Sequence, residues 1–249
     1  MKIVVLASGS KGNVTFVEHR GTRILIDIGK SCSYIENKLR DIDIEPDTIN
    51  AVLITHTHID HIDGIRTFYK RYKPTVYIMP KMLIALSELL GEFDCQYFTE
   101  VTQINDIEVN VIKTSHDVPD SVGFIINNML VYITDTGYLN KRYLLKLTNK
   151  CMYIMESNHD IEMLYTGRYP YHLKQRIASD TGHLSNVDSS NYLAQFIGTN
   201  TKHIILAHLS KENNTKDKAL ETLLNTIGIK EDLNIIVAEQ DERTQVIEI

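Results

Sequence analysis

Short apolar runs bounded by turn residues recur along the whole sequence, and they constrain the fold more than any other feature. Runs of this kind are typical of buried strands, and several are followed by stretches with helical periodicity. Hairpin-like pairs of strands followed by helices occur in both halves, which predicts an α/β fold with two sheets packed face to face and helices outside. The predicted strands are residues 2–7, 14–18, 22–28, 50–55, 75–78, 107–114, 122–127, 129–134, 152–156, 203–207, 234–238 and 245–249. The predicted helices are residues 31–41, 65–71, 80–91, 139–147, 171–177, 187–197 and 217–227.

The composition is that of an ordinary globular protein. With 249 residues, 43% hydrophobic and 23% charged, and with no linker or low-complexity segment, the chain predicts a single domain over residues 1–249. No apolar stretch approaches the ~18 residues of a spanning helix, and the N-terminal apolar run is too short for a signal peptide. We therefore expect a cytoplasmic protein with no membrane partner. Three scattered cysteines fit free thiols in a reducing compartment: Cys32, Cys95 and Cys151.

The formal net charge of −6 argues only weakly against a nucleic acid as partner. Affinity for nucleic acids comes largely from lysine and arginine on phosphates. However, six acids and one base lie in residues 231–249, so the rest of the chain is close to neutral. Bound divalent cations would also add positive charge locally.

Three of the ten histidines lie within six residues, directly after an apolar run, in the segment Thr-His-Thr-His-Ile-Asp-His of residues 55–61. In extended chain, residues two apart point the same way, so His56 and His58 can address one point. Asp60 and His61 follow, where the chain turns toward a helix. A lone histidine is usually a packing or surface residue, but imidazole and carboxylate at this spacing are the ligands of a catalytic Zn²⁺ or Mn²⁺.

Further ligand-type residues follow apolar strands elsewhere in the chain. His116, Asp135 and His208 each lie where a predicted strand meets a polar loop. Each has an ordinary interpretation on its own, because His and Asp are common at strand ends. Together with the first loop they give seven ligands for two metal sites, with Asp135 available as a bridge.

This pattern, His-x-His-x-Asp-His followed by the later His, Asp and His, resembles the metallo-β-lactamase superfamily. The resemblance covers essentially the whole chain and implies a four-layer αββα sandwich. Within the superfamily the chain is similar to the YycJ/WalJ/VicX family, relatives of tRNase Z and of the PhnP phosphodiesterase. The motifs that carry this likeness are residues 6–13, 156–160, 180–186 and 207–210.

The resemblance also implies roles for single residues. One metal ion would be held by His56, His58 and His116. The other would be held by Asp60, His61 and His208, with Asp135 bridging the two. His183, in a Gly-His-Leu-Ser loop, resembles the histidine that nuclease-type members place near the leaving-group oxygen, and Glu156 matches the carboxylate that orients it.

Two positions separate subfamilies by their chemistry. A carboxylate in place of His58 would resemble the di-iron, oxygen-reducing members, and a cysteine in place of Asp135 would resemble the true β-lactamases. Neither substitution is found here.

The activity implied by the resemblance is that of a binuclear metal-dependent phosphodiesterase, with a 5′-to-3′ DNA exonuclease favoured. A metal-bridging hydroxide would attack phosphorus, His183 would act as general acid, and Asp60 would serve as a ligand that steadies the attacking water. The expected cofactors are two divalent ions, zinc or manganese, with iron as a third option. The expected partner is nucleic acid, DNA before RNA, with a link to DNA repair; a homodimer stays open.

Two groups of residues are candidates for substrate contacts. The 8–13 loop offers backbone N–H groups and the side chains of Ser8, Ser10 and Asn13, which would cradle a terminal phosphate; the alternative is a tight turn without a ligand. A set of basic residues would hold the nucleic acid backbone or form a solvated face: Lys70, Arg71, Lys73, Lys141, Arg142, Lys174 and Arg176.

Two other functions compete with a nuclease. A small-molecule hydrolase, acting on cyclic phosphodiesters or on thioesters and lactones, needs the same metals, and its thioester version would not need His183. A metal-binding partner of a signalling complex without catalytic activity would be inert toward every diester.

Overall fold

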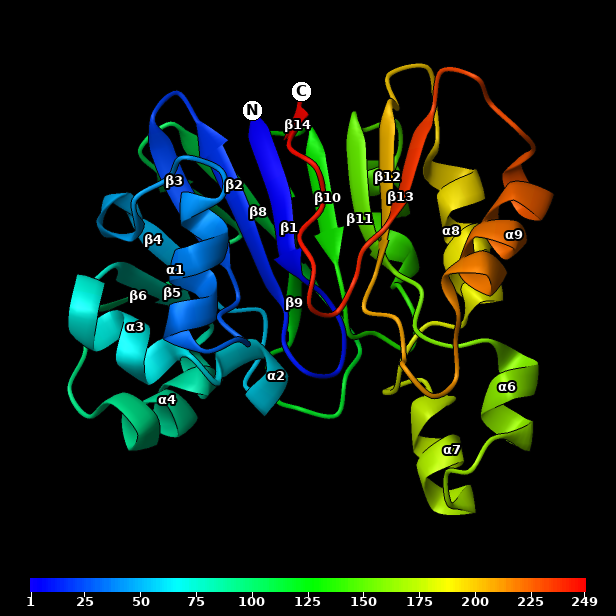
Figure 1. Cartoon of the computed structure of the whole chain (residues 1–249), viewed down its shortest axis with the longest axis horizontal. Coiled ribbons are helices and arrows are strands. Elements are labelled where there is room, and N and C mark those ends of the chain that lie inside the picture. Colours follow the sequence, from blue (N-terminus) through cyan, green and yellow to red (C-terminus); the bar gives the residue numbers. More distant parts are fainter. The chain divides into compact units, whose positions relative to one another are not determined.

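The computed structural model describes all 249 residues, Met1–Ile249, and the chain divides into two compact units (Figure 1). Unit 1 contains residues 1–111, 118–122 and 239–249, and unit 2 contains residues 112–117 and 123–238. Each unit is built from a mixed β-sheet and helices. That the whole chain forms one domain stays a prediction.

The sheet of unit 1 is antiparallel on one side and parallel on the other. Strands β1 to β3 are joined as antiparallel neighbours, while β3 to β6 run parallel to one another. A two-residue turn, Arg20-Gly21, joins β2 to β3; both residues have positive φ, which matches the twist of a hairpin. The strand order is β14 (Ile247–Glu248), β1 (Lys2–Ala7), β2 (Val14–His19), β3 (Thr22–Ile26), β4 (Ala51–Leu53), β5 (Thr75–Ile78) and β6 (Cys95–Tyr97).

The helices of unit 1 connect its parallel strands. The helix α1 begins at an N-cap, Ser31, whose hydroxyl accepts from Tyr34 N, and it buries Ile35 and Leu39. Unit 1 also contains the antiparallel hairpin of β7 (Val101–Ile104) with the first part of β8 (Ile107–Lys113). The helices are α1 (Cys32–Arg40), α2 (Ile59–Ile62), α3 (Ile65–Tyr72) and α4 (Leu83–Leu90), with the short 3-10 turns η1 (Pro46–Thr48) and η2 (Pro80–Met82).

The sheet of unit 2 is mostly parallel. Strands β9 and β10 form an antiparallel pair, and β10 to β13 run parallel. Every residue of β10 and β11 is buried, as expected for parallel strands covered on both faces. The strands are β9 (Val122–Ile126), β10 (Leu130–Ile133), β11 (Met152–Glu156), β12 (His203–Ala207) and β13 (Asn234–Val237).

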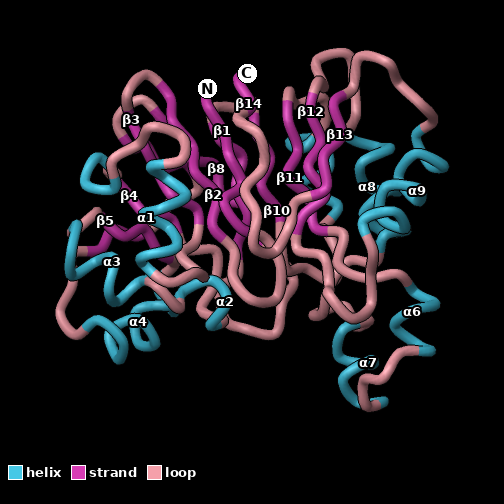
Figure 2. The backbone as a smooth tube through the Cα atoms, viewed as in Figure 1, coloured by secondary structure: helices cyan, strands magenta, loops and turns pink.

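Two long helices supply much of the core of unit 2. Leu193 and Phe196 of α8 and Leu223 of α9 join a cluster with buried residues of β11 and β12. A second helix pair, α6 and α7, lies beyond the ends of these strands (Figures 1 and 2), and α7 buries none of its residues. The helices are α5 (Leu144–Leu147), α6 (Ile161–Thr166), α7 (Tyr171–Ile177), α8 (Asn186–Phe196) and α9 (Lys216–Ile227), with η3 (Lys141–Tyr143).

The structure contains most of the predicted elements and four that were not predicted. The unpredicted ones, α2, α6, β6 and β7, are all short, so they carry little periodicity. The predicted strand over residues 50–55 is shortened to Ala51–Leu53, and that over residues 245–249 to Ile247–Glu248. All three cysteines are free, as predicted. None of the helices combines the length and the apolar composition that a membrane span requires.

Two leucines of unit 2 allow a matched test of its core. Leu193 is 0% exposed and Leu145 is 90% exposed. We expect Leu193→Ala to lower the free energy of unfolding by about 2–5 kcal/mol, because a cavity remains in the cluster. Leu145→Ala should change it by less than about 0.5 kcal/mol. Urea titration followed by circular dichroism measures both, and equal effects would contradict this packing.

Candidate metal centre

The ends of two neighbouring parallel strands place the polar residues of unit 1. Strand β3 is followed by Asp27, which has a left-handed backbone (φ 61°), and β4 leads through Thr55 into the histidine-rich loop. Thr55 N donates a hydrogen bond to Asp27 Oδ1 at 2.8 Å, which joins the two strand ends. Adjacent parallel strands end at the same edge of the sheet, so the loop begins beside a buried carboxylate.

Asp27 holds His61 in one orientation. His61 Nδ1 lies 2.8 Å from Asp27 Oδ2, and both side chains are fully buried. Burial raises the pKa of Asp27, and the neighbouring His61 and Thr55 act in the opposite direction. Because a carboxylate accepts, this contact places the proton of His61 on Nδ1 and the lone pair on Nε2.

The imidazole rings of the same loop converge. His56 Nε2 and His58 Nδ1 are 3.2 Å apart, and the ring centroids of His56 and His61 are 4.0 Å apart. Asp60 Oδ2 lies 3.6 Å from His61 Nε2. Three imidazoles and one carboxylate within a single loop form a donor set suited to divalent cations.

Close backbone packing holds this loop in place. A Cβ atom added to Gly29 would lie 1.6 Å from Asp60 O and 2.6 Å from Asn13 N. Only glycine fits here, because the three segments that contain Gly29, Asp60 and Asn13 touch through their backbones.

Hydrogen bonds within unit 1 close the 8–13 loop. Gly9 N donates to Asn13 Oδ1 at 2.8 Å, and Gly12 N donates to Gly9 O at 3.0 Å. Ser8 N and Lys11 N are also hydrogen bonded within unit 1. The buried Asn13 amide instead lies 3.0 Å from His61 Nε2, whereas Ser10 is exposed. These contacts favour the tight-turn interpretation, and the phosphate cradle stays a prediction.

In unit 2, three neighbouring strands place their polar residues at their carboxyl ends. Asp135 lies two residues after β10, Glu156 is the last residue of β11, and His208 follows β12. Asp135 and His208 have left-handed backbones, with φ of 53° and 57°. The donor atoms of these three residues and of His183 all lie within 4.8 Å of one another.

Glu156 is the centre of this cluster. Its Oε1 accepts from His183 Nδ1 at 2.7 Å and from His208 Nδ1 at 2.9 Å. Its Oε2 accepts from Thr136 N at 3.0 Å and from Leu184 N at 3.1 Å. Complete burial alone would raise the pKa of Glu156, but the two histidines hold it at about 2. Glu156 is thus an ionised carboxylate with four donors.

His116 shows the same type of orientation. Its Nδ1 lies 3.1 Å from Gly182 O, so the ring donates to a carbonyl through Nδ1 and turns Nε2 toward Asp135 Oδ1, 3.9 Å away. Burial lowers the pKa of His116, which favours the neutral ring that a metal requires. His61, His116 and His208 therefore all have Nδ1 held by an oxygen, which is the usual arrangement of ligands that bind through Nε2. These residues fit divalent metal ions.

Comparison with known proteins agrees with this geometry. Residues 7–127 match the family model described as the metallo-beta-lactamase superfamily. The chain is 36% identical over 263 aligned residues to the exodeoxyribonuclease WalJ of Streptococcus pneumoniae strain D39, which covers 100% of this chain and 98% of that protein. The chain belongs to the WalJ/YycJ family of metallo-β-lactamase-fold proteins. It is also 37% identical over 223 residues to the exodeoxyribonuclease YycJ of Bacillus anthracis, covering 86% of this chain and 84% of that protein.

A solved structure supports the fold assignment. The metallo-β-lactamase-fold protein YhfI from Bacillus subtilis superposes with a TM-score of 0.75 at 16% identity, covering 98% of this chain and 99% of YhfI. The predicted α/β fold class of the metallo-β-lactamase type is confirmed.

Each predicted metal ligand and catalytic residue of this WalJ/YycJ family member lies in one of two groups. Unit 1 brings together His56, His58, Asp60, His61 and Asn13. Unit 2 brings together His116, Asp135, Glu156, His183 and His208.

Some residues that orient these groups were not among the predicted site residues. Asp27 and Thr55 hold His61, and Thr136 N contacts Glu156. The sequence gives no signal for Asp27, because the predicted strand over residues 22–28 contains it. Asp160 caps α6 by accepting a hydrogen bond from Met163 N, whereas His159 is buried and burial lowers its pKa to about 4.

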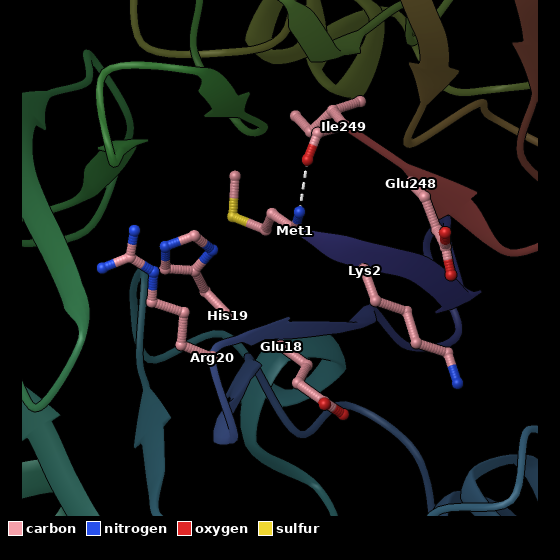
Figure 3. Close-up of a pocket in the computed structure, with 7 residues that line it drawn as sticks. All are labelled: Met1, Lys2, Glu18, His19, Arg20, Glu248 and Ile249. Carbon is pink, nitrogen blue, oxygen red and sulfur yellow. Dashed lines mark hydrogen bonds between the residues drawn. The ribbon is translucent and has the colours of Figure 1, made fainter.

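Unit 1 has a cavity of about 430 Å³ beside the chain ends (Figure 3). It is lined by the start of β1, by His19 and Arg20 of the β2–β3 turn, and by Glu248 with Ile249. The 8–13 loop lies at the opposite end of β1. The cavity contains none of the predicted site residues.

Replacing Asp27 tests the orientation of His61. In Asp27→Asn, the amide keeps the acceptor for Thr55 N but loses the charge that fixes His61 Nδ1–H. We expect metal affinity to fall by about 10- to 100-fold, the usual effect of such a change. Competition with a fluorescent zinc chelator measures it. Asp43→Asn is the matched control, because Asp43 is exposed and has the same φ of 61°; equal affinities in both variants would contradict the role of Asp27.

The depressed pKa of Glu156 predicts a pH dependence of stability. A carboxyl whose folded pKa is about 2, below the ordinary 4.5, stabilises the fold above pH 4.5 and loses this contribution as pH falls toward 2. In metal-free protein, Glu156→Gln should therefore flatten the acid side of the stability curve. Denaturant titrations at a series of pH values test this, with the exposed Glu162→Gln as control. An unchanged acid slope in Glu156→Gln would refute the assignment.

Proposed function

We propose that this chain is a metal-dependent exodeoxyribonuclease that removes nucleotides from the 5′ ends of DNA. Its WalJ and YycJ relatives are named exodeoxyribonucleases. The observation that carries the proposal is the 2.7 Å hydrogen bond between Glu156 and His183, within the cluster that also contains Asp135 and His208. A hydrolase that expels a poor leaving group needs such an oriented proton donor.

Two divalent metal ions, zinc or manganese, are the cofactors of this proposal. Bound there, they would lower the pKa of a water molecule toward neutrality and offset the charge of the phosphodiester. The tautomers of His61, His116 and His208 support such a role, since each presents Nε2. The proposed ligands of one ion are His56, His58 and His116, and those of the other are Asp60, His61 and His208, with Asp135 shared.

His183 is the proposed general acid. Glu156 keeps one proton on Nδ1, so the imidazolium gives the Nε2 proton to the departing sugar oxygen. The His183 side chain is 21% exposed and that of Glu156 is 0% exposed, so substrate reaches the imidazole but not the carboxylate. Glu156 is thus a positioning residue for the acid. Asp60, a proposed ligand, also steadies the attacking water.

Three further predictions come from the sequence. A cytoplasmic location and a role in DNA repair stay predictions. So does contact of Ser8, Ser10 and Asn13 with substrate, for which only the exposed Ser10 hydroxyl has a supporting position.

His183→Ala tests the proposed reaction. With 5′-phosphorylated duplex DNA and Mn²⁺ or Zn²⁺, we expect kcat to fall by about 10²- to 10⁴-fold, because the leaving oxygen loses its proton donor. Bound metal, measured by plasma mass spectrometry, should not change. His19→Ala, on the β2–β3 turn of unit 1, is the control and should match the wild type.

Substrate comparison separates the competing functions. The wild type and His183→Ala are assayed on the DNA, on single-stranded RNA, on a cyclic dinucleotide and on a thioester. The proposal requires DNA to be the preferred substrate and His183 to matter for it. Preference for the thioester with full activity in His183→Ala, or for the cyclic dinucleotide, would replace it by a small-molecule hydrolase.

A further inference from the structure

The 165–176 segment of unit 2 has an unusual composition for this chain. It contains three tyrosines, a histidine and three cationic residues, but no aspartate or glutamate, whereas the whole chain has a net charge of −6. It includes the end of α6, the connection to α7 and most of α7. Its aromatic and cationic residues include Tyr165, Arg168, Tyr171, Lys174 and Arg176.

The side chains of this segment are not used for a core. No residue of α7 is buried, although a surface helix normally buries an apolar stripe. Tyr171 is 71% exposed and Tyr165 is 50% exposed. Arg168 is exposed and makes no ion pair. Large aromatic faces and a cation are therefore available to a partner.

The segment is nevertheless fixed in shape. Lys174 Nζ donates to Tyr165 O and to Gly167 O, both at 2.7 Å, which ties α7 to the connection before it. Gln175 Nε2 donates to the Tyr171 hydroxyl at 2.7 Å. Aromatic side chains held in this way lose little conformational entropy on binding.

One end of α7 lies at the candidate general acid. His183 N donates to Ile177 O at 2.9 Å, and Arg176 pairs with Asp117 at 2.5 Å, next to His116. The helix from Tyr171 to Ile177 rises about 10 Å. The exposed tyrosine is thus one short helix away from the residue that contacts the candidate general acid.

We propose that the 165–176 segment binds a single-stranded stretch of DNA that adjoins the nucleotide being cleaved. Bases stack on Tyr171 and Tyr165, and Arg168 contacts a phosphate. Stacking on aromatic faces with cations along the backbone is the general mode of binding single strands without sequence preference. This inference rests on the proposed nuclease function and names where its substrate strand runs.

Fluorescence anisotropy with a labelled, 5′-phosphorylated oligothymidylate tests the proposal. EDTA prevents cleavage, so binding is measured apart from reaction. Tyr171→Ala should weaken binding by about 5- to 100-fold, and Tyr171→Phe should restore it, because stacking does not need the hydroxyl. Arg168→Gln should reduce the slope of log K against log[salt] by about 0.7. Circular dichroism confirms that the variants are folded.

Matched controls come from unit 1. Tyr97→Ala removes a tyrosine that is 46% exposed, and Arg20→Gln removes an exposed arginine; neither should change the affinity.

The outcomes separate this inference from the proposed function. If the wild type releases nucleotides and Tyr171→Ala binds the oligonucleotide as tightly as the wild type, the inference fails and the nuclease stands. If Tyr171→Ala instead converts a dimer to a monomer in sedimentation while DNA affinity is unchanged, the segment is a self-interface and the inference is wrong. If the wild type neither binds nor cleaves DNA, both fail.

Discussion

The hydrogen bond from imidazole Nδ1–H to a fixed oxygen is the interaction on which the candidate site depends. Asp27 supplies it to His61, Gly182 O to His116, and Glu156 to His208. Burying an ionised carboxylate costs several kcal/mol unless donors surround it. Glu156, with four donors, offsets that cost with the same contacts that orient the two histidines. In unit 2, the same hydrogen bonds therefore stabilise the buried Glu156 carboxylate and orient His183 and His208.

The metal ligands were the part of the site that could be predicted, because residue types and their spacing are visible in the sequence. Imidazoles at spacing two in His56 and His58, and ligand-type residues after apolar strands, gave every proposed metal ligand. Asp27 was missed because the predicted strand over residues 22–28 contains it, and only the 2.8 Å contact with His61 distinguishes it. Sequence spacing identifies residues that act together locally, but not an orienting partner that is far along the chain.

The 8–13 loop shows a second limit of prediction from the sequence. Its glycines and serines permit both a phosphate cradle and a closed turn, and these differ only in where the N–H groups point. The side chain of Asn13 favours the closed turn, because its Oδ1 accepts a hydrogen bond from Gly9 N and its amide nitrogen contacts His61. Likewise, the fold class followed from the apolar runs, but short elements such as α6 have too few residues for a periodicity. Their boundaries depend on capping, as by Asp160, and on tertiary contacts.

Backbone conformation adds a constraint that no side-chain pattern reveals. Asp27, Asp135 and His208 all leave their strands with positive φ, between 53° and 61°, a conformation that costs non-glycine residues of order 1 kcal/mol or more. Glycine would remove the strain but also the carboxylate or imidazole. Asp27 contacts Thr55, and His208 contacts Asp135 and Glu156, which lie at or just beyond the carboxyl ends of neighbouring strands. The strained backbone thus occurs where a polar side chain follows a buried strand. Hydrogen bonds hold two of these side chains in place: Glu156 contacts His208, and Thr55 contacts Asp27.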